Sequence, residues 1–336
     1  MKKQYAAIDI AKYVSALLVV CIHTYPLLEV SETLNTFFIQ VICRMAVPFF
    51  FVSSGYFFFQ KEFASKEESL DYLIRYEKRL FKIYAIWTIV YLPYTILDYA
   101  HSGFRLYHVL SYLRDVVLNG SYYHLWFLPA LMLGTFIVWI LLTYIGPKRM
   151  YQVVGSLYFV GYLINVFTPI WQSLPFVSFV FGFFTKLMVT SRNGLFFAPI
   201  FLAIGYLLAT TKRLRRKVSG LGWCICTLLL ACEVSLYYFL GILRDLTSMY
   251  LLLVPLTFFM TNFLLTSHRY YKPVYLQLRH ESLLIYTSHI LFAAIGLKLF
   301  PNAHLVVFFL TVAGAQTLAA LVLKYRKRYP ILEHLL

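Results

Sequence analysis

Two ionisable side chains in the first apolar segment, Lys12 and His23, are spaced so that they can act together. They are eleven residues apart, close to three helical turns, so a helix places both on one face, about 16 Å apart along its axis. Asp9 lies one turn before Lys12 and can pair with it. His23 can serve as a general base toward a hydroxyl group. The alternatives are a histidine that packs between helices and a lysine that reaches the polar end of its helix.

Arg44 is a guanidinium inside the second apolar segment, shortly before Pro48 and the small residues Ser53, Ser54 and Gly55. A guanidinium at that depth can hold an anion, orient a carbonyl oxygen or stabilise a developing oxyanion. We therefore expect a catalytic role for Arg44. The alternative is a structural ion pair, for example with Glu233.

Arg79 and Lys82 lie one turn apart before the third apolar segment, at the expected start of a helix. Cations at a helix start are suited to phosphate groups. Together with Lys12 they form a candidate site for a phosphorylated donor. The alternative is a basic loop that only orients the chain and contacts lipid head groups.

Three further side chains are candidates for the binding of an acceptor substrate: His124, Arg192 and His289. His124 is the first residue of one apolar segment, and Arg192 lies just before another. Ser282, Tyr286 and His289 recur on one face of a later helix. Aromatic anchoring near His124 and a polar seam between helices at His289 are the alternatives.

The composition of the 336 residues indicates the kind of structure that holds these side chains in place. Hydrophobic residues make up 61%, charged residues 13%, and the mean hydropathy is +0.72. Soluble domains are nearer half apolar and a quarter charged. We therefore expect an all-α, polytopic membrane protein with a single membrane domain over residues 1–336 and no soluble domain.

Apolar windows of about 20 residues predict ten membrane spans. They are 8–28, 35–59, 83–99, 124–144, 152–168, 194–209, 220–240, 249–266, 282–299 and 305–323. With the N-terminus inside, 22 of the 30 Lys and Arg residues fall in inner segments and five in outer ones. Both termini are thus expected in the cytoplasm, with the protein in a bacterial plasma membrane and in contact with its lipids.

The net charge of +16 does not indicate nucleic-acid binding, because the cations lie in short clusters between apolar segments. The five cysteines all fall in apolar segments, so we expect neither a disulfide framework nor a metal site. No permanently bound cofactor is expected. Coenzyme A has the shape that this distribution requires of a donor, with phosphates at one end and a thioester on an extended arm.

The same residues carry a resemblance to the membrane acyltransferase 3 family, which acylates cell-envelope glycans and other extracytoplasmic acceptors. Lys12 and His23, preceded by Asp9, are similar to the family's Arg-x10-His pattern. The run from Phe50 to Tyr56 and the spacing of Arg79 and Lys82 are similar to two further family motifs. Lysine replaces arginine at positions 12 and 82, so the phosphate would interact with a compact ammonium charge and not with a bidentate guanidinium.

Within that family, the segments that begin at Arg44, His124 and Arg192 resemble the membrane half of vancomycin-resistance serine racemases. Those racemases carry a soluble pyridoxal-phosphate domain after the last span. The sequence here ends at Leu336, so we expect no racemisation from it.

The resemblance implies an O-acyltransferase, most simply an O-acetyltransferase, that moves an acyl group from cytoplasmic acyl-CoA to a hydroxyl on an outer acceptor. That acceptor would be a cell-envelope glycan or a small hydroxyl compound such as serine. The main alternative is a transporter or flippase for serine or a lipid-linked glycan, which would use the same buried cations for binding. A third is a scaffold for a partner enzyme. The sequence does not indicate the oligomeric state.

Overall fold

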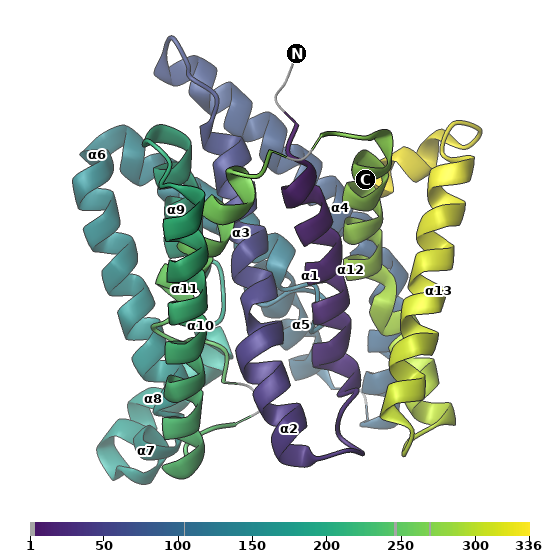
Figure 1. Ribbon diagram of the computed structural model, residues 1–336. Coiled ribbons are helices and arrows are strands. Elements are labelled where there is room, and N and C mark those ends of the chain that lie inside the picture. The colour runs from purple at the N-terminus through teal and green to yellow at the C-terminus, as the bar shows by residue number, and fades with distance from the viewer. Residues whose placement is uncertain (1–3, 104, 245–246, 269) are drawn as a thin grey trace. The chain divides into compact units, whose positions relative to one another are not determined.

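The computed structural model describes residues 4–103, 105–244, 247–268 and 270–336, and all regular secondary structure in these ranges is helical (Figure 1). This confirms the predicted all-α class. Lys2, Lys3 and Arg269, three of the cations in the charge count, lie outside the described residues.

Each of the ten predicted apolar segments contains helix within the described residues. Seven helical runs there are long and apolar enough to cross a membrane. They are Ala6–Thr24, Glu32–Phe59, Lys66–His101, Phe127–Val166, Arg216–Phe239, Pro273–Leu299 and His304–Tyr325. Three shorter apolar helices accompany them, Pro175–Met188, Ala198–Thr210 and Leu253–Leu265. The first of these was not expected, because it lies in a segment predicted to be an outer loop.

The fourth and fifth predicted spans are joined in one helical run, α6 (Phe127–Val166). The run breaks at Gly146, whose φ of 77° and ψ of 170° are not helical, and Pro147 follows it. Glycine adopts this positive φ without a steric penalty, and proline lacks the N–H that would continue the helix. A glycine–proline break therefore replaces the predicted loop.

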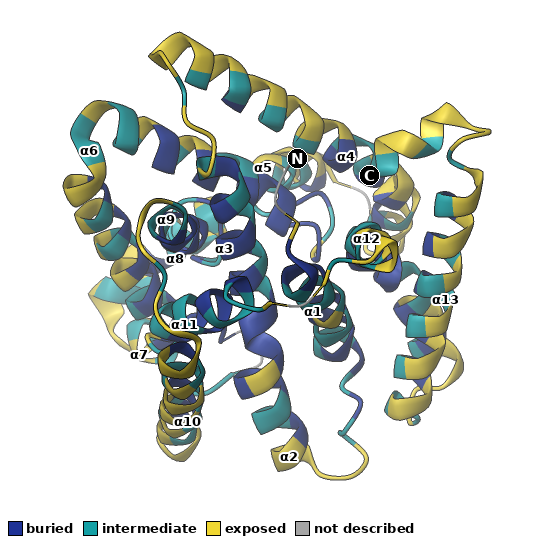
Figure 2. Cartoon of the chain, turned by 45° about the horizontal axis from the view of Figure 1, so that its top comes forward, coloured by how far each residue is buried: buried dark blue, intermediate teal, exposed yellow. Residues whose placement is uncertain are grey.

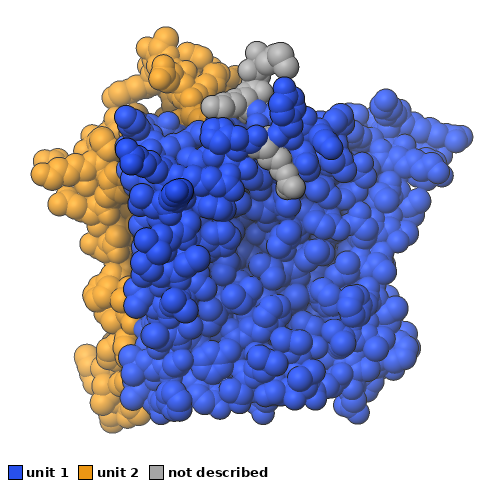
Figure 3. All heavy atoms as spheres, viewed as in Figure 1, with its two compact units in different colours: residues 1–54, 207–241, 252–336 blue, residues 55–206, 242–251 orange. Residues whose placement is uncertain are grey.

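The chain divides into two compact units (Figure 3). The first contains residues 1–54, 207–241 and 252–336, and the second contains residues 55–206 and 242–251. The helices of the first unit are α1 (Ala6–Thr24), α2 (Glu32–Phe37), α10 (Arg216–Phe239), α11 (Leu253–Leu265), α12 (Pro273–Leu299) and α13 (His304–Tyr325). Those of the second are α4 (Lys66–His101), α5 (Leu106–Leu118), the broken α6, α7 (Thr168–Ser173) and α8 (Pro175–Met188). By residue number, α3 (Ala46–Phe59) and α9 (Ala198–Thr210) pass from one unit into the other.

The core of the first unit forms where α1 packs against α12 and α12 packs against α13. Ala16, Val20, Ile285 and Ala315 are completely buried in one cluster there. Figure 2 shows α1 largely buried, whereas α10 and the outer face of α13 are mostly exposed. The start of α1 and the end of α13 lie at the same end of this unit (Figure 1).

The second unit is organised around α4, a helix of 36 residues. It begins at a sequence that favours helix initiation, because the Ser65 hydroxyl accepts a hydrogen bond from the Glu68 N–H. The Trp139 indole of α6 donates to the Ser69 hydroxyl at 2.7 Å. The Tyr84 hydroxyl donates to the Val116 carbonyl oxygen on α5 at 2.7 Å. These polar contacts fix α5 and α6 against α4.

Candidate active site

His23 and His289, both predicted from sequence, lie together in the first unit. Their ring centroids are 5.2 Å apart, with the ring planes tilted by 39°. His23 is half-buried near the end of α1, and His289 is completely buried on α12. The predicted catalytic base and one predicted acceptor-side residue are therefore neighbours.

The ring of His289 is held by its own helix. Its Nδ1 lies 2.7 Å from the Tyr286 carbonyl oxygen and 3.1 Å from that of Ile285. Carbonyl oxygens only accept hydrogen bonds, so Nδ1 carries the hydrogen, and Nε2 of the neutral ring is an acceptor. His289 thus presents a defined tautomer beside His23.

The segment after His23 is tied to the start of α13 by contacts that the sequence did not indicate. Tyr25, in a left-handed conformation with φ of 51°, ends α1. The His304 ring Nδ1 lies 2.8 Å from the Thr24 carbonyl oxygen, and the His304 N–H donates to the Glu29 carboxylate. Because these residues are far apart in the chain, no local pattern could have predicted the contacts.

Asp9 forms an ion pair different from the one expected. Its buried carboxylate accepts from the Arg279 guanidinium at 2.7 and 2.8 Å, and from the Tyr271 hydroxyl at 3.0 Å. The bidentate fork of an arginine matches a carboxylate better than the single ammonium of Lys12 does. Burial and then the Asp9 charge raise the pKa of Tyr271, which keeps its hydroxyl protonated as a donor.

A second carboxylate, missed from sequence, lies buried in the same unit. Glu281 on α12 is 3% exposed and accepts from the Gln277 amide at 2.7 Å. Tyr13 of α1 donates to the Gln316 side chain of α13 at 3.0 Å. The prediction had begun the ninth span at Ser282, one residue later, and so had placed Glu281 in a loop.

Arg44 is 8% exposed, and its Nε donates to the Gln40 side-chain oxygen at 2.8 Å. Gln40 belongs to a π-helical turn, Phe38–Ile42, and Arg44 to the 3₁₀ turn Cys43–Met45 that follows. π-helical turns are frequent at functional sites, and here one interrupts a segment predicted as regular helix. Glu233, the alternative partner for Arg44, accepts from the Tyr237 hydroxyl and from the Leu252 N–H.

The predicted donor residues fall in different units. Lys12 is half-buried on α1 in the first unit, while Arg79 and Lys82 are exposed on α4 in the second. The expectation that Arg79 begins a helix is wrong, because α4 starts at Lys66. Arg79 could therefore contact a phosphate through its side chain, but not through the free amide groups of a helix N-terminus.

His124 and Arg192, the other predicted acceptor-side residues, both belong to the second unit. His124 is 1% exposed, and its ring meets the Tyr91 ring edge-on at 4.8 Å between centroids. The Arg192 guanidinium lies 4.8 Å from the centre of the Trp126 ring. Each of the two side chains therefore lies against an aromatic ring.

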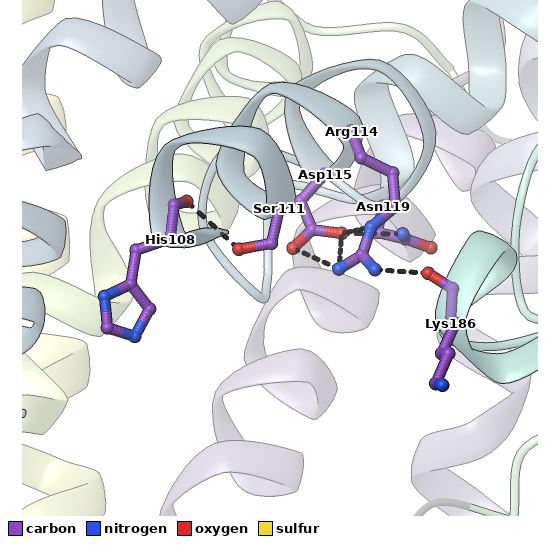
Figure 4. Close-up of polar contacts among 6 residues, drawn as sticks. All are labelled: His108, Ser111, Arg114, Asp115, Asn119 and Lys186. Carbon is purple, nitrogen blue, oxygen red and sulfur yellow. Dashed lines mark hydrogen bonds and ion pairs between the residues drawn. The ribbon is translucent and has the colours of Figure 1, made fainter. Parts of the chain in front are cut away.

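A polar cluster on α5 braces the segment predicted to be outside (Figure 4). Arg114 donates twice to the Asp115 carboxylate, each time at 3.0 Å, and once to the Lys186 carbonyl oxygen on α8 at 2.6 Å. Asn119 also donates to Asp115, at 2.9 Å. One arginine thus connects the ends of α5 and α8.

The family model for an acyltransferase domain matches residues 5–325. An amino-acid racemase of Enterococcus faecalis is 31% identical over 265 residues, which are 78% of this chain and 36% of that protein. A serine/alanine racemase of Enterococcus gallinarum is 30% identical over 264 residues, 78% of this chain and 37% of that protein. The chain therefore spans little more than a third of the length of these relatives. No solved structure matches it.

The motifs at Lys12, His23, Arg79 and Lys82, the helical architecture and the family match over nearly the whole sequence agree with one another. The chain belongs to the membrane acyltransferase 3 family.

Proposed function

We propose that this protein is a membrane O-acetyltransferase that moves an acetyl group from cytoplasmic acetyl-CoA to a hydroxyl group of an extracytoplasmic acceptor. The observation that carries the proposal is the pair of imidazoles in the first unit, His23 and His289, 5.2 Å apart. A base at this position lies on the same continuous helix as Lys12. One helix therefore bears both the proposed donor-binding cation, in its first half, and the proposed base, in its last turn.

In the proposed reaction, the His23 imidazole accepts the proton of the acceptor hydroxyl while that oxygen attacks the thioester carbonyl carbon. The carbonyl oxygen becomes negatively charged, and the Arg44 guanidinium stabilises it or orients the carbonyl beforehand. The tetrahedral intermediate then releases the coenzyme A thiolate, which takes the proton from His23. The products are the acetyl ester and free coenzyme A, and the side chains return to their starting states.

His289, His124 and Arg192 are proposed to line the acceptor side, and Lys12, Arg79 and Lys82 to hold the donor phosphates. For His289, the support is its contact with His23 and its fixed tautomer. For Arg79 and Lys82, it is their exposure three residues apart on one helix. A cell-envelope glycan is the proposed acceptor class.

A second candidate function is the transport of serine or a related amino acid. It is favoured by the name of one relative, the serine/alanine racemase, which is similar to this chain over 78% of the chain's length. In this case the buried polar groups would bind the substrate without reacting.

Calorimetric titration of the detergent-purified protein with acetyl-CoA tests the donor site. The Arg79→Gln/Lys82→Gln variant should bind about tenfold more weakly or worse, because charge-assisted contacts to phosphate are lost. Arg75→Gln/Lys78→Gln is the matched control, with both positions exposed on the same helix. Equal binding by both double variants would refute the donor site.

Transfer of labelled acetyl groups to membrane glycans then tests the chemistry. His23→Ala should lose at least about 100-fold in rate, the range for a general base. His268→Ala, an exposed histidine of the same unit, should remain active. Full transfer by His23→Ala would overturn the mechanism. Serine uptake into liposomes without any acetyl-CoA binding would favour the transporter.

A further inference from the structure

An apolar groove with a volume of about 640 Å³ runs along α1 in the first unit, between α1, α10 and α11. Small and aliphatic side chains of α1 form one wall. Trp223 and Thr227 of α10 and Met260 and Leu264 of α11 form the other. The α1 wall consists of Ala7, Ile10, Ala11, Val14, Ser15 and Leu18.

The length of the groove matches one leaflet of a bilayer. Its α1 wall extends from Ala7 to Leu18, which is about 16 Å at the rise of an α-helix. Half of a hydrocarbon core of about 30 Å is about 15 Å. The groove is therefore about as long as the hydrocarbon region of one leaflet is thick.

One end of the groove is cationic. Arg216 and Ser267 line it. Arg213 donates to the Leu265 carbonyl oxygen and to the Tyr5 hydroxyl. The starts of α1 and α10 and the end of α11 therefore meet at this end. Residues 212–217 contain five cations and no acid.

The other end of the groove is apolar. Leu18, Ile42 and Met45 line it. Val14, halfway along, is 47% exposed, and Ile42 is 37% exposed. In a membrane-spanning chain, such surface is turned toward lipid or toward a bound apolar molecule.

We propose that the groove binds an anionic glycerophospholipid. One acyl chain lies between α1, α10 and α11, and the head-group phosphate lies at Arg216. An apolar channel one leaflet deep with a cationic mouth is complementary in both shape and charge to this molecule.

The lipid site is distinct from the candidate active site. At 100° per residue, the groove residues of α1 occupy the face roughly opposite to Lys12 and His23. The proposal therefore does not depend on the proposed acyl transfer and can be tested without it.

Trp223 is a natural reporter, because bromine atoms on an acyl chain quench tryptophan fluorescence on contact. The protein is placed in phosphatidylcholine bilayers that contain increasing fractions of phosphatidylglycerol with brominated chains. The signal lost in Trp223→Phe defines the Trp223 component. The control reporter is Cys224→Trp in the Trp223→Phe background, which puts a tryptophan at an exposed neighbouring position of the same helix.

Trp223 should reach half of its full quenching at a phosphatidylglycerol fraction roughly five-fold lower than the control reporter does. This factor corresponds to the binding energy of one cation–phosphate contact at a membrane surface. Arg216→Gln should remove this difference, and Arg215→Gln, which alters a cation outside the groove, should keep it. Equal curves for the two reporters in otherwise unmodified protein would overturn the proposal. The proposal would also be overturned if the difference between the two reporters persisted in Arg216→Gln, or if inorganic phosphate alone abolished it.

Discussion

The imidazole ring of His23, on α1, lies 5.2 Å from that of His289, on α12, measured between centroids. Two carbonyl oxygens of α12 fix the orientation of the His289 ring. A base that must meet a substrate in one geometry benefits from a neighbour that cannot rotate. We therefore propose for His289 a role in positioning His23 that can be separated from donor binding.

His289→Gln should lower kcat for acetyl transfer about tenfold and leave the KM for acetyl-CoA unchanged, because only the placement of His23 and the acceptor is disturbed. Steady-state kinetics with varied acetyl-CoA measure both constants. Ser288→Ala is the control, since that buried hydroxyl donates only to the Leu284 carbonyl oxygen of its own helix. A wild-type kcat in His289→Gln would remove His289 from the site.

Arg279→Gln should destabilise the protein by about 2–3 kcal/mol, because it leaves the completely buried Asp9 carboxylate without its bidentate partner. The expected signal is a lower Tm in detergent. Lys327→Gln, which removes an exposed cation from the same unit, should leave the Tm unchanged. Identical melting of the two variants would show that the Asp9–Arg279 pair contributes nothing to stability.

Gly55→Ala should destabilise the protein by about 1–3 kcal/mol through overpacking. A Cβ at this glycine would lie 2.5 Å from the backbone oxygen of Leu202, an atom that a rotamer change cannot move away. At Gly155, an added Cβ meets nothing within 4 Å, so Gly155→Ala should be neutral or slightly stabilising. Thermal unfolding of the two variants side by side checks the difference, and equal melting would contradict it.

Arg114→Ala should release α8 from α5, because one guanidinium joins the Asp115 carboxylate to the Lys186 carbonyl oxygen (Figure 4). Amide hydrogen exchange in residues 175–188 should become about five-fold faster, the equivalent of roughly 1 kcal/mol. Lys186→Ala should have no such effect, since Arg114 contacts the backbone and not the side chain of Lys186. Faster exchange in both variants would mean that another contact fixes α8.

Features that depend on neighbouring residues in the chain could be predicted from the sequence. Hydropathy located the helical segments, and helical spacing placed Lys12 and His23 on one continuous helix. Contacts between residues far apart in the chain could not be predicted. No sequence pattern near Asp9 indicates Arg279 as its partner, and none near His304 indicates Thr24. The convergence of His23 and His289 followed only in part, since motifs nominated both residues but did not bring them together.

Helix boundaries were the weaker part of the prediction. Apolar windows show where a segment becomes hydrophobic and not where its helix starts. The third span was predicted to begin at Ile83 and its helix at Arg79, whereas α4 starts at Lys66. For the same reason Glu281 was assigned to a loop. At Gly146 the predicted separation into two helices is present, because the φ and ψ of this glycine are not helical, but the two helices follow each other directly and without the predicted loop.

At the rise of an α-helix, the 36 residues of α4 extend about 54 Å, much further than a hydrocarbon core of about 30 Å requires. Arg79 and Lys82 lie 13 and 16 residues after the first residue of α4, Lys66, so helical backbone extends on both sides of them. A flexible loop with the same two cations would lose conformational entropy each time it gripped a phosphate. A ligand that binds to α4 meets cations whose backbone is already ordered, so more of the contact energy remains available as affinity.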